Sequence, residues 1–422
     1  MNSKIICYLS KFSSFLNNIL DSHNEKLYKR KCKLAFRDIF YYLIYLVSNN
    51  KNSATTITDH IKINNYCNAA KDAYIKKRST IPSQVFDEIF NDLLKYFYTN
   101  LQPKTYKHKR ILCIDGTYVP LSILMAENGY SATKNEAYCN ALISGLYDKS
   151  NNIILDLSLC KHKDEREAVN NHMSYFKKGD IIIMDRGYYS EELLFKLNKL
   201  GVKVVFRLKK NSTMLTNLND KKDVTIELEN SEEKIKFRLL KYTIFVDDVP
   251  KIFYIGTTLP QYFTFNKIKN LYKDRWSIEE YFKCAKMYQS LDSFHSKKEN
   301  LIKQEIHIHK CIMIITKILQ DCYLKNLGTR LFNESLFKIN LKNFIDKIPI
   351  LIGKIIYKYD KKKDIIIMKI FKIILILCDS LTKIVNNRSF KRIRIVPGSM
   401  WYQKSHKTTS NSKNDKNSQK CV

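Results

Sequence analysis

A charged segment from Tyr272 to Lys286, with the sequence YKDRWSIEEYFKCAK, decides the fold. It contains no Gly or Pro, and its apolar residues recur at three- and four-residue spacings, which predicts an amphipathic helix. On a helical wheel of roughly 100° per residue, four side chains share an arc of about 60°: Tyr272, Arg275, Glu279 and Lys286. A buried stripe is predicted beside this arc, and Glu280 is predicted to face outward, about 100° from Glu279. The alternative is a solvated face with ion pairs one turn apart.

Two segments upstream each place an aspartate directly after an apolar run. Residues 111–115 read ILCID and are followed by Gly, and residues 180–187 read DIIIMDRG. Each run predicts a buried strand whose C-terminal end delivers a carboxylate into a turn. One such aspartate is usually only a turn or helix cap. Two of them, Asp115 and Asp185, followed by Glu279 on a helix, favour a catalytic set of three carboxylates.

The spacing in the charged segment resembles the Y-R-E-K motif of bacterial cut-and-paste transposases, the insertion-sequence-4 type of DDE transposase. The segments around the two aspartates also resemble the first and second catalytic motifs of that family. Six residues carry the resemblance, which covers roughly residues 30–400: Asp115, Asp185, Tyr272, Arg275, Glu279 and Lys286. It implies DNA cleavage at both ends of a mobile element, a hairpin intermediate and strand transfer into a target. The implied partner is double-stranded DNA, at the terminal repeats and the target, bound by a homodimer.

The predicted order of elements is three strands, a helix, a strand, a helix, a strand and a final helix that carries Glu279. It fits an α/β fold: a ribonuclease-H-like catalytic core with helices on both faces of a sheet, and helical N- and C-terminal regions. Apolar residues in period-two alternation predict a β-rich insertion with a turn at Asp247-Asp248 and Pro250. The expected parts are a helical DNA-binding domain (1–108), the catalytic core (109–208 and 263–300), a β-strand insertion (209–262), a helical C-terminal region (301–402) and a disordered tail (403–422).

Short helices predicted at residues 56–63 and 69–77 are compatible with a helix-turn-helix DNA reader or with an ordinary small bundle. The formal net charge of +32, from 73 Lys and Arg against 41 Asp and Glu, also favours a nucleic-acid partner. Its alternative is a compositional bias towards Lys, Ile and Asn.

Eleven cysteines without paired Cys-x-x-Cys spacing argue against a disulfide framework and against a structural zinc site. The most apolar run, at residues 365–378, is interrupted by Lys369 and Lys372 and is too short to span a bilayer. We therefore expect a soluble, cytoplasmic, DNA-associated protein with no membrane partner.

Three converging carboxylates supply the hard oxygen ligands that suit two Mg²⁺ ions about 4 Å apart, with Mn²⁺ as a substitute. One ion would activate water or a DNA 3′-hydroxyl, and the other would stabilise the leaving oxygen. The predicted catalytic and metal-binding residues are Asp115, Asp185 and Glu279. Arg275 and Lys286 are expected to grip the adjacent phosphates, and Tyr272 is expected to hydrogen-bond a phosphate oxygen.

Other classes of DNA enzyme lack their motifs here. None of the nine histidines has Arg three residues later, as a tyrosine recombinase would need. A phosphate-binding loop of the form Gly-x4-Gly-Lys-Ser/Thr is also missing from the sequence, which argues against an ATP-driven helicase. Two alternatives stay open: a catalytically inactive or domesticated DNA-binding protein derived from a transposase, and a stand-alone nuclease.

Overall fold

The computed structural model describes most of the chain. The described residues are 2–30, 32–49, 53–57, 61, 66–67, 69–133, 137–246, 249–327, 337–358 and 363–383. The turn predicted at Asp247-Asp248, much of the short helix predicted at 56–63 and the tail predicted at 403–422 lie outside them. Among the described helices, none has both the length and the apolar composition needed to cross a membrane.

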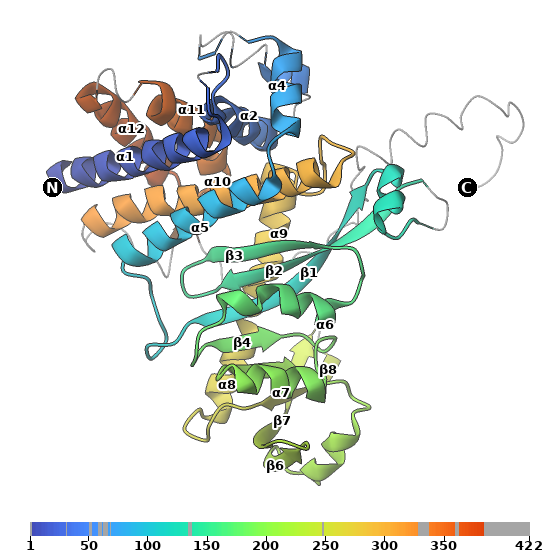
Figure 1. Cartoon of the computed structure of the whole chain (residues 1–422). Helices are drawn as coiled ribbons and strands as arrows, with labels where there is room; N and C mark the ends of the chain where they lie inside the picture. The colour runs from blue at the N-terminus through green and yellow to red at the C-terminus, as the bar shows by residue number, and fades with distance from the viewer. Residues whose placement is uncertain are drawn as a thin grey trace, which may run out of the picture.

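Helices from both ends of the chain form one layer (Figure 1). The N-terminal helices are α1 (Asn2–Leu27), α2 (Phe36–Asn49), α3 (Ser53–Thr56), α4 (Lys71–Ser79) and α5 (Ser83–Asn100). The C-terminal elements are α10 (Glu299–Leu327), α11 (Leu341–Lys358) and α12 (Lys363–Asp379), with a two-stranded sheet of β9 (Phe337–Ile339) and β10 (Leu381–Lys383). Helix α1 packs on α10 and α12, and α2 packs on α11, so the two helical regions share one apolar cluster.

Eight strands form one mixed sheet in the order β3-β2-β1-β4-β5-β8-β7-β6. Its first five strands are β1 (Ile111–Leu121), β2 (Cys139–Asp148), β3 (Ile153–Cys160), β4 (Ile181–Met184) and β5 (Lys203–Arg207). β1, β2 and β3 are antiparallel neighbours, whereas β4 runs parallel to β1 and β5 runs parallel to β4. This strand order and these directions confirm the ribonuclease-H-like core.

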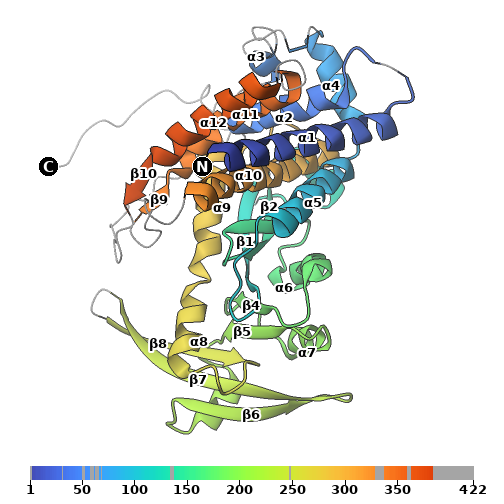
Figure 2. The ribbon, with the colours of Figure 1, turned by 90° about the vertical axis from the view of Figure 1, so that its left-hand side faces the viewer.

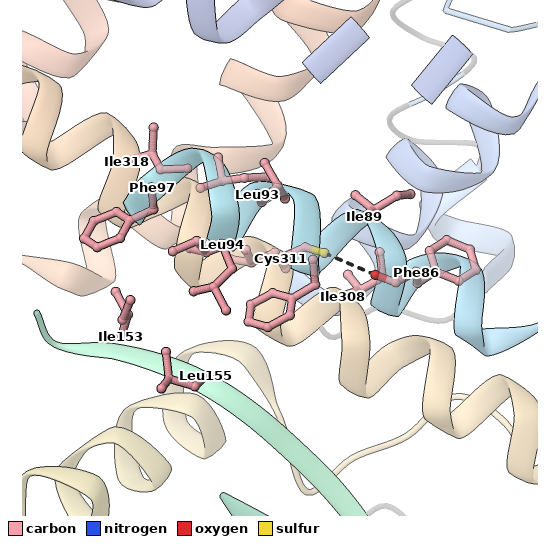
Figure 3. Close-up of a cluster of buried hydrophobic side chains, with 14 of the residues drawn as sticks. Phe86, Ile89, Leu93, Leu94, Phe97, Ile153, Leu155, Ile308, Cys311 and Ile318 are labelled. Atoms are coloured by element: carbon pink, nitrogen blue, oxygen red, sulfur yellow. Dashed lines mark hydrogen bonds between the residues drawn. The ribbon is translucent and has the colours of Figure 1, made fainter. Parts of the chain in front are cut away.

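Helices cover both faces of this core because its strands alternate their apolar side chains. On β1, Leu112 and Ile114 belong to the cluster shared with the helical layer, whereas Ile111 and Cys113 belong to the opposite cluster. On the first side, α5 and α10 pack on β3, as the close-up in Figure 3 shows for Leu94, Ile153 and Leu155, among others. The same side carries α6 (Glu165–Ala168), the 3-10 helix η3 (Val169–Tyr175) and α7 (Glu191–Lys199).

The opposite side is covered by α8 (Phe265–Lys273) and α9 (Trp276–Gln289). Figure 2 shows α9 running beside the sheet from the β8 end to the helical layer. Its predicted buried stripe is confirmed, and the stripe comes very close to β2. A methyl group placed on Gly145 would lie 2.8 Å from Cζ of Phe282, so glycine is needed there for α9 to dock.

The single helix predicted from Tyr272 to Lys286 is wrong in one respect. The chain ends α8 at Lys273 and starts α9 at Trp276. Between them the amide of Ser277 donates to the carbonyl of Asp274, and that of Ile278 to Arg275, which is the tighter three-residue spacing. The helical wheel is therefore interrupted at the arginine of the motif.

The predicted insertion continues the main sheet. It contains the 3-10 helix η4 (Thr213–Leu218) and the strands β6 (Asp223–Glu229), β7 (Lys234–Val246) and β8 (Val249–Thr257), with β8 antiparallel to β5. The long β7 merges two predicted runs, and its apolar phase shifts: Phe237 and Leu239 join one cluster, and Leu240 and Tyr242 join the other. Pro250 lies in β8, not in a turn. The division of the chain into domains stays a prediction.

Candidate active site

The parallel pairing of β1 and β4 brings the two predicted aspartates to one place. Cys113 of β1 lies opposite Ile183 of β4, so two residues further along each chain Asp115 comes beside Asp185. The prediction that β1 ends at Asp115 is wrong, because β1 continues to Leu121 along β2. β4 is the strand that ends here, at Met184, so the carboxylate of Asp115 emerges beside the end of its neighbour rather than from a turn of its own.

The join between α8 and α9 delivers the other predicted side chains to these aspartates. The hydroxyl of Tyr272, in the last turn of α8, donates to Oδ1 of Asp185 at 2.8 Å. The guanidinium of Arg275 donates through one nitrogen to Oδ2 of Asp115 at 2.8 Å, and through the other to Oε1 of Glu279 at 2.5 Å. Five of the six predicted residues therefore meet at one place, in two groups of hydrogen bonds: Tyr272 with Asp185, and Arg275 with Asp115 and Glu279.

Arg275 is the centre of the second group and is itself buried. Its side chain is 10 % exposed, against 16 % for Asp115 and 35 % for Glu279. Its guanidinium also lies over the ring of Tyr272, 5.9 Å from the centroid. Desolvation opposes its charge, but Tyr272 and the carboxylates around it raise the pKa of Arg275 above its ordinary value. Arg275 therefore holds a fixed positive charge between the carboxylates.

The electrostatics of the two aspartates differ although they are neighbours. Burial raises the pKa of Asp115 to about 6, with Glu279 and Asp185 adding to the shift and Arg275 opposing it. Burial also acts on Asp185, but the amide of Arg186, the guanidinium of Arg275 and the hydroxyl of Tyr272 outweigh it and hold its pKa below the ordinary value. The surroundings therefore stabilise the charged form of Asp185 and disfavour that of Asp115.

The fit of a divalent metal ion depends on Arg275. In the part of the chain that the structure describes, no three His, Cys, Asp or Glu side chains are grouped so that they could hold a metal. The donor types are nevertheless the hard oxygens that Mg²⁺ and Mn²⁺ bind. Because the guanidinium stands between Asp115 and Glu279, these carboxylates are arranged around a cation already, and a metal ion would have to displace or share it.

Lys286 lies further along α9, and its Nζ donates to the backbone carbonyl of Tyr118 at 2.9 Å. Burial lowers its pKa, and Asp292 opposes that shift. Lys286 joins Asp115 and Glu279 in lining an open groove of about 560 Å³ between β1 and α9. The sixth predicted residue thus borders the same site without joining the network around Arg275.

Glu279 and Glu280 are separated as the wheel predicts. Glu279 lies in the first turn of α9 and faces the site, whereas Glu280 is exposed. Which of them binds a metal stays a prediction, but only Glu279 is bonded to Arg275.

The sequence analysis missed Arg207, the last residue of β5. Its guanidinium is 3.6 Å from Oδ1 of Asp185 and lies 4.5 Å from the ring centroid of Phe253. β4 and β5 are parallel, and Met184 lies opposite Phe206, so the next residue of each chain falls at the same edge of the sheet. A basic residue at the end of the adjacent parallel strand was the signal for this second cation.

Part of the chain matches a known protein family. Residues 106–315 match the family model described as the transposase DDE domain. A protein of Synechocystis sp. (strain ATCC 27184 / PCC 6803 / Kazusa), described as a transposase for insertion sequence element IS4SA, is 32 % identical over 163 residues. That match covers 36 % of this chain and 45 % of the relative, so the chain spans less than half the length of this relative.

A solved structure of the piggyBac transposase synaptic complex with hairpin DNA resembles the chain with a TM-score of 0.46 at 12 % identity, covering 87 % of this chain and 82 % of that one. The stretch matched by the family model contains Asp115, Asp185 and the charged segment from Tyr272 to Lys286. The chain therefore belongs to the DDE transposases, of the insertion-sequence-4 type.

Proposed function

We propose that this protein is a transposase that cuts DNA at the ends of a mobile element and transfers the strands to a target, using Mg²⁺. The observation that carries the proposal is that Asp115 and Glu279 are bridged by the buried Arg275, while Asp185, beside Asp115, accepts a hydrogen bond from Tyr272 at the same join. Divalent metal ions are general cofactors of DDE transposases. Mg²⁺, with Mn²⁺ as a substitute, suits an all-carboxylate donor set.

The three carboxylates are the proposed metal ligands. Two bound Mg²⁺ ions would supply an activated water or DNA 3′-hydroxyl and would stabilise the leaving oxygen. The positively charged side chains of this chain would supply the other interactions with the DNA. Arg275, Lys286 and Arg207 surround the carboxylates, and they would bind the phosphates on either side of the cut and offset negative charge as it grows in the transition state.

Tyr272 has a positioning role in this proposal. Its hydroxyl donates to Asp185, which orients that carboxylate, and desolvation raises the pKa of Tyr272, so it remains a protonated donor at neutral pH. Its contacts with Asp185 and with Arg275, which lies over its ring, hold the join between α8 and α9 against the sheet. To donate to a phosphate oxygen instead, the hydroxyl would have to release Asp185, because it carries one proton.

The DNA partner is proposed from the family and from charge. A net charge of +32 would give an affinity that falls steeply with salt, because Lys and Arg contacts to phosphate release counterions. The homodimer in the DNA complex is proposed from the resemblance to the family alone.

The test is a cleavage and strand-transfer assay with duplexes that end in the inverted repeats flanking the gene. We expect nicking and double-strand cleavage at the repeat ends in Mg²⁺, followed by joining to a plasmid target. Cleavage without joining would make the protein a nuclease. Salt-dependent binding without cleavage would make it a catalytically inactive DNA-binding protein. The control is the same assay with Asp185→Asn, which keeps the size of the side chain and removes its charge.

A further inference from the structure

The glycine of the loop after Asp185 leaves room for a further carboxylate. A methyl group placed on Gly187 would lie 2.9 Å from Oε2 of Glu165, whereas one placed on Gly116 would meet Leu142 at 2.7 Å and would lie in ordinary contact with Oε1 of Glu165, at 3.7 Å. The carboxylate of Glu165 therefore lies between the backbone after Asp115 and the backbone after Asp185. Gly187 does not have a positive φ, so its contribution is the space that it leaves for Glu165 and not an unusual backbone conformation.

Two neighbours hold Glu165 in this position. Asp164 caps the first turn of α6, accepting hydrogen bonds from the amides of Arg166 and Glu167. Nε of Arg166 donates to the carbonyl of Gly187 at 2.9 Å, which ties α6 to the loop after Asp185. Residue 165 is therefore presented to the site by contacts on both sides of it in the chain.

The carboxylate of Glu165 has no partner of its own. No hydrogen bond or ion pair to it occurs among the described residues, although the side chain is half-buried. Burial raises its pKa, and the nearby carboxylates of Asp185 and Asp164 add to the shift. A half-buried carboxylate beside other carboxylates costs free energy unless a cation balances it.

We propose that Glu165 is a fourth carboxylate of the active site and helps to hold the divalent metal ion bound by Asp185. This rests on the proposed function, since it assigns one more residue to the same metal-dependent cleavage. The glycine of the Asp-Arg-Gly segment then has a physical purpose, because a larger residue at 187 would force the carboxylate of Glu165 to move from its present position.

The experiment measures Mn²⁺ binding to the full-length protein by the loss of the free-ion signal in electron paramagnetic resonance, so it does not depend on activity. The variants are Glu165→Gln and the control Glu167→Gln, an exposed glutamate of the same helix turn. Asp185→Asn reports on the proposed site itself. We expect Glu165→Gln to weaken Mn²⁺ binding by about 10–100-fold, the range seen when groups around a metal site are removed. Glu167→Gln should bind like the wild type.

Gly187→Ala provides an independent variant. It should weaken Mn²⁺ binding by displacing the carboxylate, and it should add nothing when Glu165 is already Gln, which a double-mutant cycle measures. If Asp185→Asn weakens binding and Glu165→Gln does not, the inference about Glu165 is wrong and the proposed function stands. If Asp185→Asn also binds Mn²⁺ like the wild type, the proposed metal site itself is wrong, and the role of Glu165 falls with it.

Discussion

Arg275→Ala should allow the carboxylate cluster to bind a cation more tightly, and it should destabilise the folded protein when no cation is bound. The guanidinium bridges Asp115 and Glu279, and both it and Asp115 are largely buried. Removing one partner of a buried ion pair leaves an uncompensated charge and costs about 3–5 kcal/mol. Without divalent metal, we expect the free energy of unfolding of the variant to be lower than that of the wild type by about this amount.

Added Mg²⁺ should reverse part of the loss, because the ion can now occupy the place of the guanidinium. A ligand that binds only the folded state at 100 times its dissociation constant stabilises it by about 2.7 kcal/mol. We therefore expect Mg²⁺ at this concentration to raise the free energy of unfolding of Arg275→Ala by about 2–3 kcal/mol, and that of the wild type by less, because there the ion has to compete with the guanidinium.

The assay is urea unfolding followed by circular dichroism, with and without Mg²⁺ at constant ionic strength. Arg275→Lys is the matched control, since it keeps one positive charge but cannot bridge two carboxylates with a planar fork. The variant and the wild type gaining equally from Mg²⁺ would refute the reasoning, because Arg275 and the metal would then not share their ligands.

Three further predictions follow from other contacts. Glu279→Gln should abolish Mg²⁺-dependent cleavage in a gel assay and Glu280→Gln should leave it near the wild-type rate, since Glu280 faces away; the reverse would show that the helix register is wrong. Lys286→Ala should slow single-turnover cleavage of bound DNA on the order of 10²-fold and change gel-shift affinity little; weaker binding with unchanged cleavage would place it outside the site. Glu305 is buried, and although desolvation opposes its charge, Arg78 and a histidine hold its pKa at about 2, below 4.5. The charge of Glu305 therefore stabilises the fold above pH 4.5, and this contribution, roughly 3 kcal/mol, should be lost as the pH falls towards 2. Measured by urea unfolding, the wild type should lose its stability advantage over Glu305→Gln between pH 4.5 and 2. An advantage that stays constant would contradict the assignment.

The central part of the fold was predictable because its signals are local. An apolar run that ends in Asp marks β1 and β4, and parallel pairing then brings Asp115 and Asp185 together without further information. The spacing of Glu279 from Arg275 needs only one helical turn. These residues were found because short-range periodicity places each of them and because their spacing resembles the motifs of a known family.

Other parts depended on contacts between distant segments, which periodicity does not encode. Glu165 comes to the site through the docking of α6 on Gly187, and Arg207 through the register of β5. The core shared by the terminal helices also depends on contacts between distant segments. Lys310 of α10 is completely buried and pairs with both Asp87 of α5 and Asp156 of β3. In the sequence, each of these is an ordinary charged residue on an amphipathic element.

The most direct test of the central claim is the metal dependence of DNA cleavage by Asp185→Cys. A thiolate is a softer ligand than a carboxylate and favours transition metals over Mg²⁺. If the side chain at 185 binds the metal, the variant should be inactive in Mg²⁺ and regain cleavage at the repeat ends in Mn²⁺, whereas Asp185→Ala should stay inactive in both. Equal activity of Asp185→Cys in the two metals, or rescue of Asp185→Ala by Mn²⁺, would contradict the account.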